Sequence, residues 1–157
     1  MLNDTLTLVS WRSRPRSFVA LMSLYESNYL RLASLAGDLR QLHDVRVSRV
    51  ADDCDLRLSV LERSPYTTSL DLTYLFPADV QGEGLTTYPD MRIRVYHDAR
   101  LVEAQEWADT VPSRPEHEVL RRLRGAVERE LDQRWARNTM LNKWLEYCID
   151  RGHGFRV

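Results

Sequence analysis

The chain has 157 residues, a length that suits a single domain. Hydrophobic residues make up 43% and charged residues 29%, both ordinary for a globular protein. The formal net charge of −1 excludes a global electrostatic field that would recruit nucleic acid or anionic lipid.

The first predicted element is a helix over residues 15–42. Ser13 is the predicted N-cap, and Pro15 suits the first turn, where its missing N–H is tolerated. Gly37 is expected either to fray the last turn or to end the helix early. Apolar residues recur at steps of three and four and form one stripe: Phe18, Leu21, Met22, Tyr25, Tyr29, Leu32 and Leu39.

The period of the apolar pattern then changes to two, which is typical of strands. Residues 55–63 and 66–74 both alternate in this way, and Pro65 lies in the turn between them. These two segments predict an antiparallel hairpin. A weaker strand over residues 45–50 is expected to precede them. Residues 76–90 contain two prolines and two glycines and are predicted as a loop.

Residues 91–107 predict the last hairpin, and the burial pattern selects its register. With residues 98–99 as the turn, Val95 lies opposite Val102, so apolar side chains share one face. A loop one residue longer would set Val95 opposite Glu103 and would mix the two faces. The other predicted pairs are His97 with Arg100, Ile93 with Ala104 and Arg94 with Glu103.

A helical pattern returns over residues 115–151. Its apolar residues form two stripes, Leu120, Leu123, Val127 and Leu131 in the first, and Leu141, Trp144, Leu145 and Cys148 in the second. Because a helix this long is unusual, we expect a break between Arg134 and Asn138 and a stop at Gly152.

The strand connections are short and carry no helix, so we predict an α+β fold with an antiparallel sheet. The sheet is expected to have four or five strands, with an N-terminal helix and one or two C-terminal helices on one face. Residues 1–157 are expected to form one domain, in which residues 1–14 are a flexible N-terminal segment. No apolar run approaches the roughly 20 residues of a membrane span, and no signal peptide is recognisable, so we expect a cytoplasmic protein.

Four segments carry a family resemblance. In order, they are LYESNYLRL (24–32), ERSPYTTSLDL (62–72), MRIRVYHDARLVEA (91–104) and NTMLNKWLEYCIDRG (138–152). Together they resemble the YqiB-like proteobacterial family, a domain of unknown function 1249, over about residues 20–152. The matching positions are Glu26, Asn28, Tyr66, Thr67, Thr68, Tyr96, His97, Asp98, Ala99, Asn138, Trp144, Cys148 and Gly152.

This resemblance implies no reaction. The chain also departs from the family pattern in two places. A Tyr-Pro-Asn segment is absent, and an Arg-Asp-Glu-Lys run survives only as Leu-Asp-Gln-Arg at residues 131–134.

His97 and Asp98 are the most conspicuous pair of titratable residues. Adjacent side chains on a strand point to opposite faces, which disfavours a His–Asp catalytic couple. We expect His97 to bond a backbone carbonyl at the end of the sheet and Asp98 to shape the turn. The alternative is a small-molecule-binding or enzymatic site near these two residues, formed by Tyr66, Thr67, Thr68, Tyr96, His97 and Asp98.

Other candidate sites have simpler explanations. Residues 51–55 (ADDCD) lack the spacing and glycine of a calcium loop and are predicted as a solvated turn. Carboxylates beside Cys54 disfavour its thiolate, and Cys148 falls on the apolar stripe of the last helix. The two cysteines lack metal-ligand spacing, so we predict no metal and no cofactor. Arginines and acids alternate over residues 116–137, which indicates an ion-paired surface rather than nucleic-acid binding.

Three tryptophans, Trp11, Trp107 and Trp135, lie outside the clearest core stripes. Tryptophan is common at the centre of protein interfaces, so these residues are candidate interface anchors. Our leading interpretation is a non-catalytic protein-interaction or regulatory module. We expect a protein partner or a homo-oligomer, with no catalytic residue, no nucleic acid and no membrane.

Overall fold

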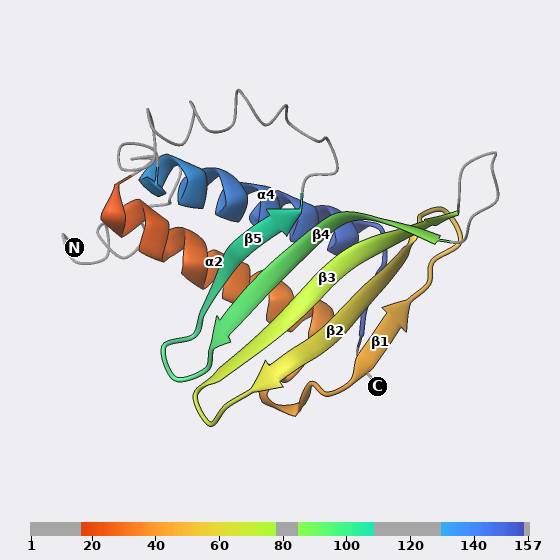
Figure 1. The fold of residues 1–157 in the computed structure, drawn as a ribbon, viewed down its shortest axis with the longest axis horizontal. Coiled ribbons are helices and arrows are strands. Elements are labelled where there is room, and N and C mark those ends of the chain that lie inside the picture. The colour runs from red at the N-terminus through yellow and green to blue at the C-terminus, as the bar shows by residue number, and fades with distance from the viewer. Residues whose placement is uncertain (1–16, 78–84, 109–129, 156–157) are drawn as a thin grey trace, which may run out of the picture.

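Two helices cover one face of a five-stranded antiparallel sheet, and the opposite face is open in Figure 1. The computed structural model describes residues 17–77, 85–108 and 130–155, and at 76–77, 85–89, 107–108 and 130–131 it describes the backbone alone. The predicted α+β fold is confirmed. The predicted flexible segment, residues 1–14, lies outside the described residues.

Helix α2 spans Phe18–Ala36, a shorter range than the sequence pattern predicts. Ser17 is the N-cap, because its backbone is extended and its side chain accepts a hydrogen bond from the Ala20 N–H at 3.1 Å. The predicted cap, Ser13, is therefore wrong. Gly37 ends the helix with φ of 79°, a conformation in which a side chain would clash. A short 3₁₀ helix, η1 (Leu39–Gln41), follows it.

The five strands follow one another in the sheet in chain order. Their bounds are Val45–Ser48 for β1, Asp55–Arg63 for β2, Thr67–Pro77 for β3, Leu85–Tyr96 for β4 and Leu101–Ala108 for β5. The β2–β3 hairpin is confirmed. The pairs Val95–Val102, Ile93–Ala104 and Arg94–Glu103 are also confirmed, so period-two burial selected the right register.

The predicted loop over residues 76–90 is strand at 76–77 and 85–90, and residues 78–84 lie outside the described residues. β3 continues to Pro77 and β4 begins at Leu85, and these two residues pair. Pro89 lies where the ladder register shifts between Thr73 and Leu75, an irregularity that accommodates a residue without an N–H. The two prolines and two glycines predict a loop, whereas Pro89 marks a bulge within a strand.

Helix α4 spans Glu130–Asp150 without interruption, so the predicted break between Arg134 and Asn138 is wrong. The segment contains neither glycine nor proline, and the Asn138 amide donates to the Arg134 carbonyl at 2.8 Å, within its own helix. Gly152 provides the predicted stop, with φ of 93°. None of the described helices is long and apolar enough to cross a membrane.

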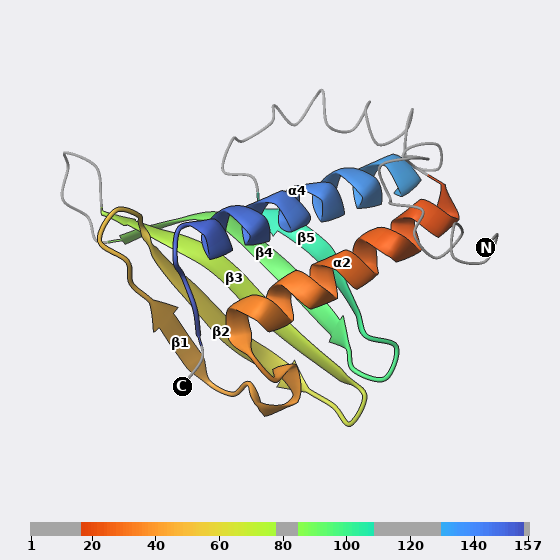
Figure 2. The same ribbon diagram turned by 180° about the vertical axis from the view of Figure 1, so that it is seen from behind.

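The core lies between the sheet and the two helices (Figure 2). The alternating leucines of β2 and β3, including Leu58 and Leu72, are fully buried there, as are Leu141 and Leu145 of α4. Each such side chain contributes roughly 2 kcal/mol on burial. A smaller cluster of Ala20, Leu21, Leu24 and Tyr25 occupies the N-terminal half of α2.

Three buried asparagines tie α2, α4 and β5 together. The Asn138 Oδ1 accepts from the Ala104 N–H at 2.7 Å and from Asn28 at 3.2 Å. Asn28 also donates to the Val102 carbonyl, and Asn142 donates to the Asn28 Oδ1 at 3.1 Å. These bonds satisfy polar groups that would be costly to bury alone, so they fix how the helices sit on the last strand.

Candidate functional site

His97 lies at the end of β4 and faces the covered side of the sheet, in line with the buried Met91, Ile93 and Val95. It is 6% exposed. Its Nε2 is 2.8 Å from the Thr68 Oγ1 on the neighbouring strand. The predicted bond from the ring to a backbone carbonyl is therefore wrong, because a side-chain hydroxyl takes that place.

The other ring nitrogen of His97 is unpartnered. Within the described residues, the buried Nδ1 has no hydrogen-bond partner. The His97 ring lines a cavity of about 210 Å³, together with Arg40, Arg63, Ser64 and Pro65. A buried ring nitrogen without a partner loses its hydration without compensation, so this nitrogen is an unusual feature of a residue that lines a cavity.

Two arginines from different elements give the cavity its positive charge. Arg40 comes from η1, and its Nη2 donates to the Asp98 Oδ1 at 2.9 Å. Arg63 comes from the end of β2 and donates to the Arg40 carbonyl, which places the two residues side by side. A guanidinium has five N–H donors, so these bonds leave donors for a ligand.

The arginines also affect the protonation of His97. Burial lowers the pKa of His97 from its ordinary value of 6.5, and the positive charges of Arg40 and Arg63 lower it further. Asp38 and Asp98 act in the opposite direction and are outweighed. At neutral pH the imidazole is therefore uncharged, and the Thr68 hydroxyl can donate to Nε2 while Nδ1 keeps its proton.

This arrangement provides donors for a small anion. Arg40, Arg63 and His97 line one cavity, and bonds from charged donors to phosphate or carboxylate oxygens are the strong ones. Ser64 supplies a hydroxyl at the same rim.

The residues predicted to form a small-molecule site do not gather in one place. Thr68 and His97 are buried together, whereas Tyr96 lies on the opposite side of the sheet, where its hydroxyl donates to the Glu103 Oε1 at 2.6 Å. Thr67 shares that opposite side by strand alternation. Tyr66 is 66% exposed in the β2–β3 turn.

Sequence reasoning missed the two arginines of the cavity. Arg63 and Ser64 lie next to the Tyr66–Thr68 segment. The basic residue Arg63 beside the turn could have indicated from the sequence that this turn carries positive charge. Arg40 reaches the site from η1, and its position relative to Asp98 depends on the tertiary fold. No local pattern identifies such a contact.

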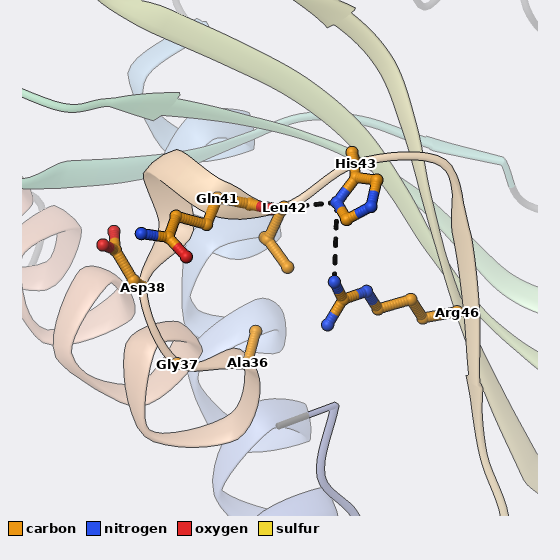
Figure 3. Close-up of a pocket in the computed structure, with 7 residues that line it drawn as sticks. All are labelled: Ala36, Gly37, Asp38, Gln41, Leu42, His43 and Arg46. Atoms are coloured by element: carbon orange, nitrogen blue, oxygen red, sulfur yellow. Dashed lines mark hydrogen bonds between the residues drawn. The ribbon is translucent and has the colours of Figure 1, made fainter. Parts of the chain in front are cut away.

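A second cavity, of about 520 Å³, is lined by residues that precede and follow η1 in the chain (Figure 3). Its rim carries Asp38, Gln41, His43 and Arg46, all exposed or half-buried. The His43 Nδ1 is 3.0 Å from the Gln41 carbonyl and 3.5 Å from the Arg46 Nη2. These rim groups bond one another, so this cavity presents no unpaired buried group to a ligand.

The structure places one of the three candidate interface tryptophans. Trp135 is half-buried and packs against the cluster around Leu21 and Tyr25. Trp11 and the side chain of Trp107 lie outside the described residues. Among the residues that are described, no group of three His, Cys, Asp or Glu side chains is arranged to hold a metal ion.

A protein-family model matches residues 31–154, which is most of the chain and includes Arg40, Arg63 and His97. The chain belongs to the DUF1249 family, described as a protein of unknown function. The resemblance drawn from the four sequence segments is confirmed. Comparisons with curated proteins and with solved structures found no match. The family assignment therefore supplies no activity, and the site has to be interpreted from its chemistry.

Proposed function

We propose that this DUF1249 protein binds a small molecule through an anionic group, a phosphate or a carboxylate, in the His97 cavity. The observation that carries the proposal is the cavity that His97 lines together with Arg40 and Arg63. The buried Nδ1 of the same ring has no partner among the described residues. An unpaired buried polar group costs about 1–3 kcal/mol, which a bound anion would recover.

The size of the cavity limits what it holds. A volume of about 210 Å³ is smaller than the usual site for a drug-sized ligand, which starts at roughly 300 Å³. The cavity therefore suits the charged end of a ligand and leaves the remainder of the molecule outside. Ser64, Pro65 and the two arginines are exposed, so the rim is accessible to such a remainder.

The test is a titration with two simple probes, inorganic phosphate and acetate. Binding is followed by the NMR signals of the His97 ring, which report a new partner at Nδ1 directly. Phosphate or acetate is expected to shift these signals saturably, and Arg40→Gln and Arg63→Gln are each expected to weaken binding by at least about fivefold.

Arg92→Gln is the matched control. Arg92 lies on the open face of the sheet, where it pairs with Asp71 and Glu106, far from the cavity rim. Equal weakening in this control would indicate a loss of general positive charge and would contradict the proposal. An unchanged His97 signal at high concentrations of both probes would also overturn it.

Partner binding in the cytoplasm stays a prediction from the sequence. The support expected from exposed tryptophans is limited, since Trp135 packs within the chain and the other two side chains lie outside the described residues. We therefore give the anion-binding site precedence.

A further inference from the structure

Three polar residues from separate segments meet at the C-terminal end of β1. Ser48 ends that strand, Asp53 lies in the following turn, and His153 lies in the tail after α4. The His153 Nδ1 is 2.9 Å from the Ser48 Oγ, and its Nε2 is 3.0 Å from the Asp53 Oδ2. The His153 side chain is fully buried, and that of Asp53 is 11% exposed. Residues 51–55 are therefore not simply the solvated turn that was predicted.

The direction of each hydrogen bond follows from the groups involved. Burial alone would raise the pKa of Asp53, but bonds from the Cys54 N–H, Tyr74 and His153 together lower it, so Asp53 is a carboxylate. A carboxylate only accepts, so Nε2 of His153 carries the proton. In a neutral ring Nδ1 is then an acceptor, and the Ser48 hydroxyl donates to it.

Two neighbouring groups hold this order in place. The Gly154 N–H donates to the Ser48 Oγ at 3.0 Å, which fills an acceptor position and turns the hydroxyl proton toward the ring. The Tyr74 hydroxyl donates to the Asp53 Oδ2 at 2.9 Å. Hydroxyl, imidazole and carboxylate thus form a directed chain, the arrangement that activates serine in hydrolases. In the usual triad Nε2 faces the serine and Nδ1 faces the carboxylate, whereas here Nδ1 faces Ser48 and Nε2 faces Asp53. The nitrogen beside the serine still accepts a hydrogen bond, and the nitrogen beside the carboxylate still donates one.

Ser48 and His153 also line a cavity of about 460 Å³. Leu35 and Val47 form apolar parts of its wall, while Ser34 and Arg49 lie at the exposed rim. A hydrogen-bonded clamp that only fastened the C-terminal tail to β1 would need no such space. The cavity is open to solvent, and Ser48, itself only 6% exposed, forms part of its wall.

We propose that Ser48 is a nucleophile toward small carboxylic esters, with His153 as general base and Asp53 as the residue that orients it. The Ser48 Oγ bonds to the ester carbonyl carbon, and its proton passes to the His153 Nδ1. The bond between the carbonyl carbon and the alkoxy oxygen then breaks, and the alcohol leaves with that proton. An acyl-serine remains. Water then attacks the acyl carbon through the same base, which releases a carboxylic acid and restores the hydroxyl.

The test uses a small fluorophosphonate, which reacts with activated serine and leaves ordinary surface serines unmodified. The folded full-length protein is incubated with the probe, and the modified residue is identified by peptide mass spectrometry. A single adduct at Ser48 is expected. Asp53→Asn is expected to slow its formation at least about tenfold, because the amide no longer fixes the imidazole tautomer.

Ser59→Ala is the matched control, since it removes a half-buried serine of β2 that does not line this cavity and is expected to leave labelling unchanged. Circular dichroism establishes that each variant is folded. Absence of an adduct on the folded wild-type protein would overturn the proposal, and so would equal labelling rates in the wild type and Asp53→Asn. Phosphate at the His97 cavity is expected to leave labelling unchanged, so the outcome is independent of the anion-binding proposal.

Discussion

The Arg40 Nη2 lies 2.9 Å from the Asp98 Oδ1 and joins η1 to the β4–β5 turn across 58 positions of the chain. The two side chains are 54% and 65% exposed, so the pair adds little to stability. Its effect on the neighbouring cavity is larger. Asp98 occupies one side of a guanidinium that would otherwise be wholly available to a bound anion.

Asp98→Asn is therefore expected to strengthen phosphate binding by roughly twofold to fivefold, since an exposed ion pair is worth up to about 1 kcal/mol. Asparagine keeps the size of the side chain and suits the turn equally well. Calorimetric titration with phosphate measures the change. Asp71→Asn, on the open face, is the control, and weaker binding by Asp98→Asn would contradict the role assigned to Arg40.

The pH dependence of folding provides a test of His97. Its pKa in the folded protein is below the ordinary value of 6.5, so as pH falls below 6.5 the unfolded chain takes up a proton that the folded protein does not. The stability associated with neutral His97 is complete above pH 6.5 and is lost progressively below it, by at most about 1.4 kcal/mol per pH unit.

His97→Gln removes this titration and keeps a partner for Thr68. The free energy of unfolding of the wild type is expected to fall more steeply than that of the variant from pH 7 to pH 5, measured by urea denaturation in chloride buffer. Carboxylates elsewhere affect both proteins alike. Parallel curves would show that the His97 pKa is not displaced. Added phosphate is expected to reduce the difference, because an anion at Nδ1 favours the imidazolium.

The amide network makes a prediction about stability. Asn138→Ala leaves the Ala104 N–H and the Asn28 amide without an acceptor in a buried setting, where each orphaned group costs about 1–3 kcal/mol. We expect a loss of about 2–4 kcal/mol in the free energy of unfolding. The adjacent Thr139→Ala is the control. Its Oγ1 is buried without a partner among the described residues, so its removal is expected to be neutral or stabilising.

The two cysteines differ in burial, and their reactivity is expected to follow. Burial raises the pKa of Cys148 to about 12. Burial, followed by the charges of Asp53 and Asp55, also raises the pKa of Cys54. With iodoacetamide at pH 8, the half-buried Cys54 is expected to react slowly and the fully buried Cys148 not at all until urea unfolds the protein. Rapid alkylation of Cys148 in the folded protein would contradict the packing around α4.

Much of the fold could be predicted because burial repeats with the period of each element. The alternation of Ile93 and Val95 with charged residues determined both the strand and its pairing with β5. Errors arose where a residue has two structural uses. Pro89 can end a strand or mark a bulge, and a serine beside a helix start is one of several possible caps.

The candidate sites were harder to predict because their members are distant in sequence. His97 and Thr68 were both singled out, but which of the neighbouring hydroxyls faces the ring depends on the pairing of β3 with β4. Ser48 and His153 are 105 positions apart, and neither has a distinctive local context. Only packing of the tail after α4 against β1 brings them together.

The order of the strands has a consequence for synthesis on the ribosome. Every strand pairs with its neighbour in sequence, so the sheet can assemble hairpin by hairpin as the chain emerges. Of the two described helices that cover it, however, α4 is translated after all five strands. The leucine-rich face of the nascent sheet therefore stays partly bare until α4 has been translated, and it is during this interval that the chain most needs protection from aggregation.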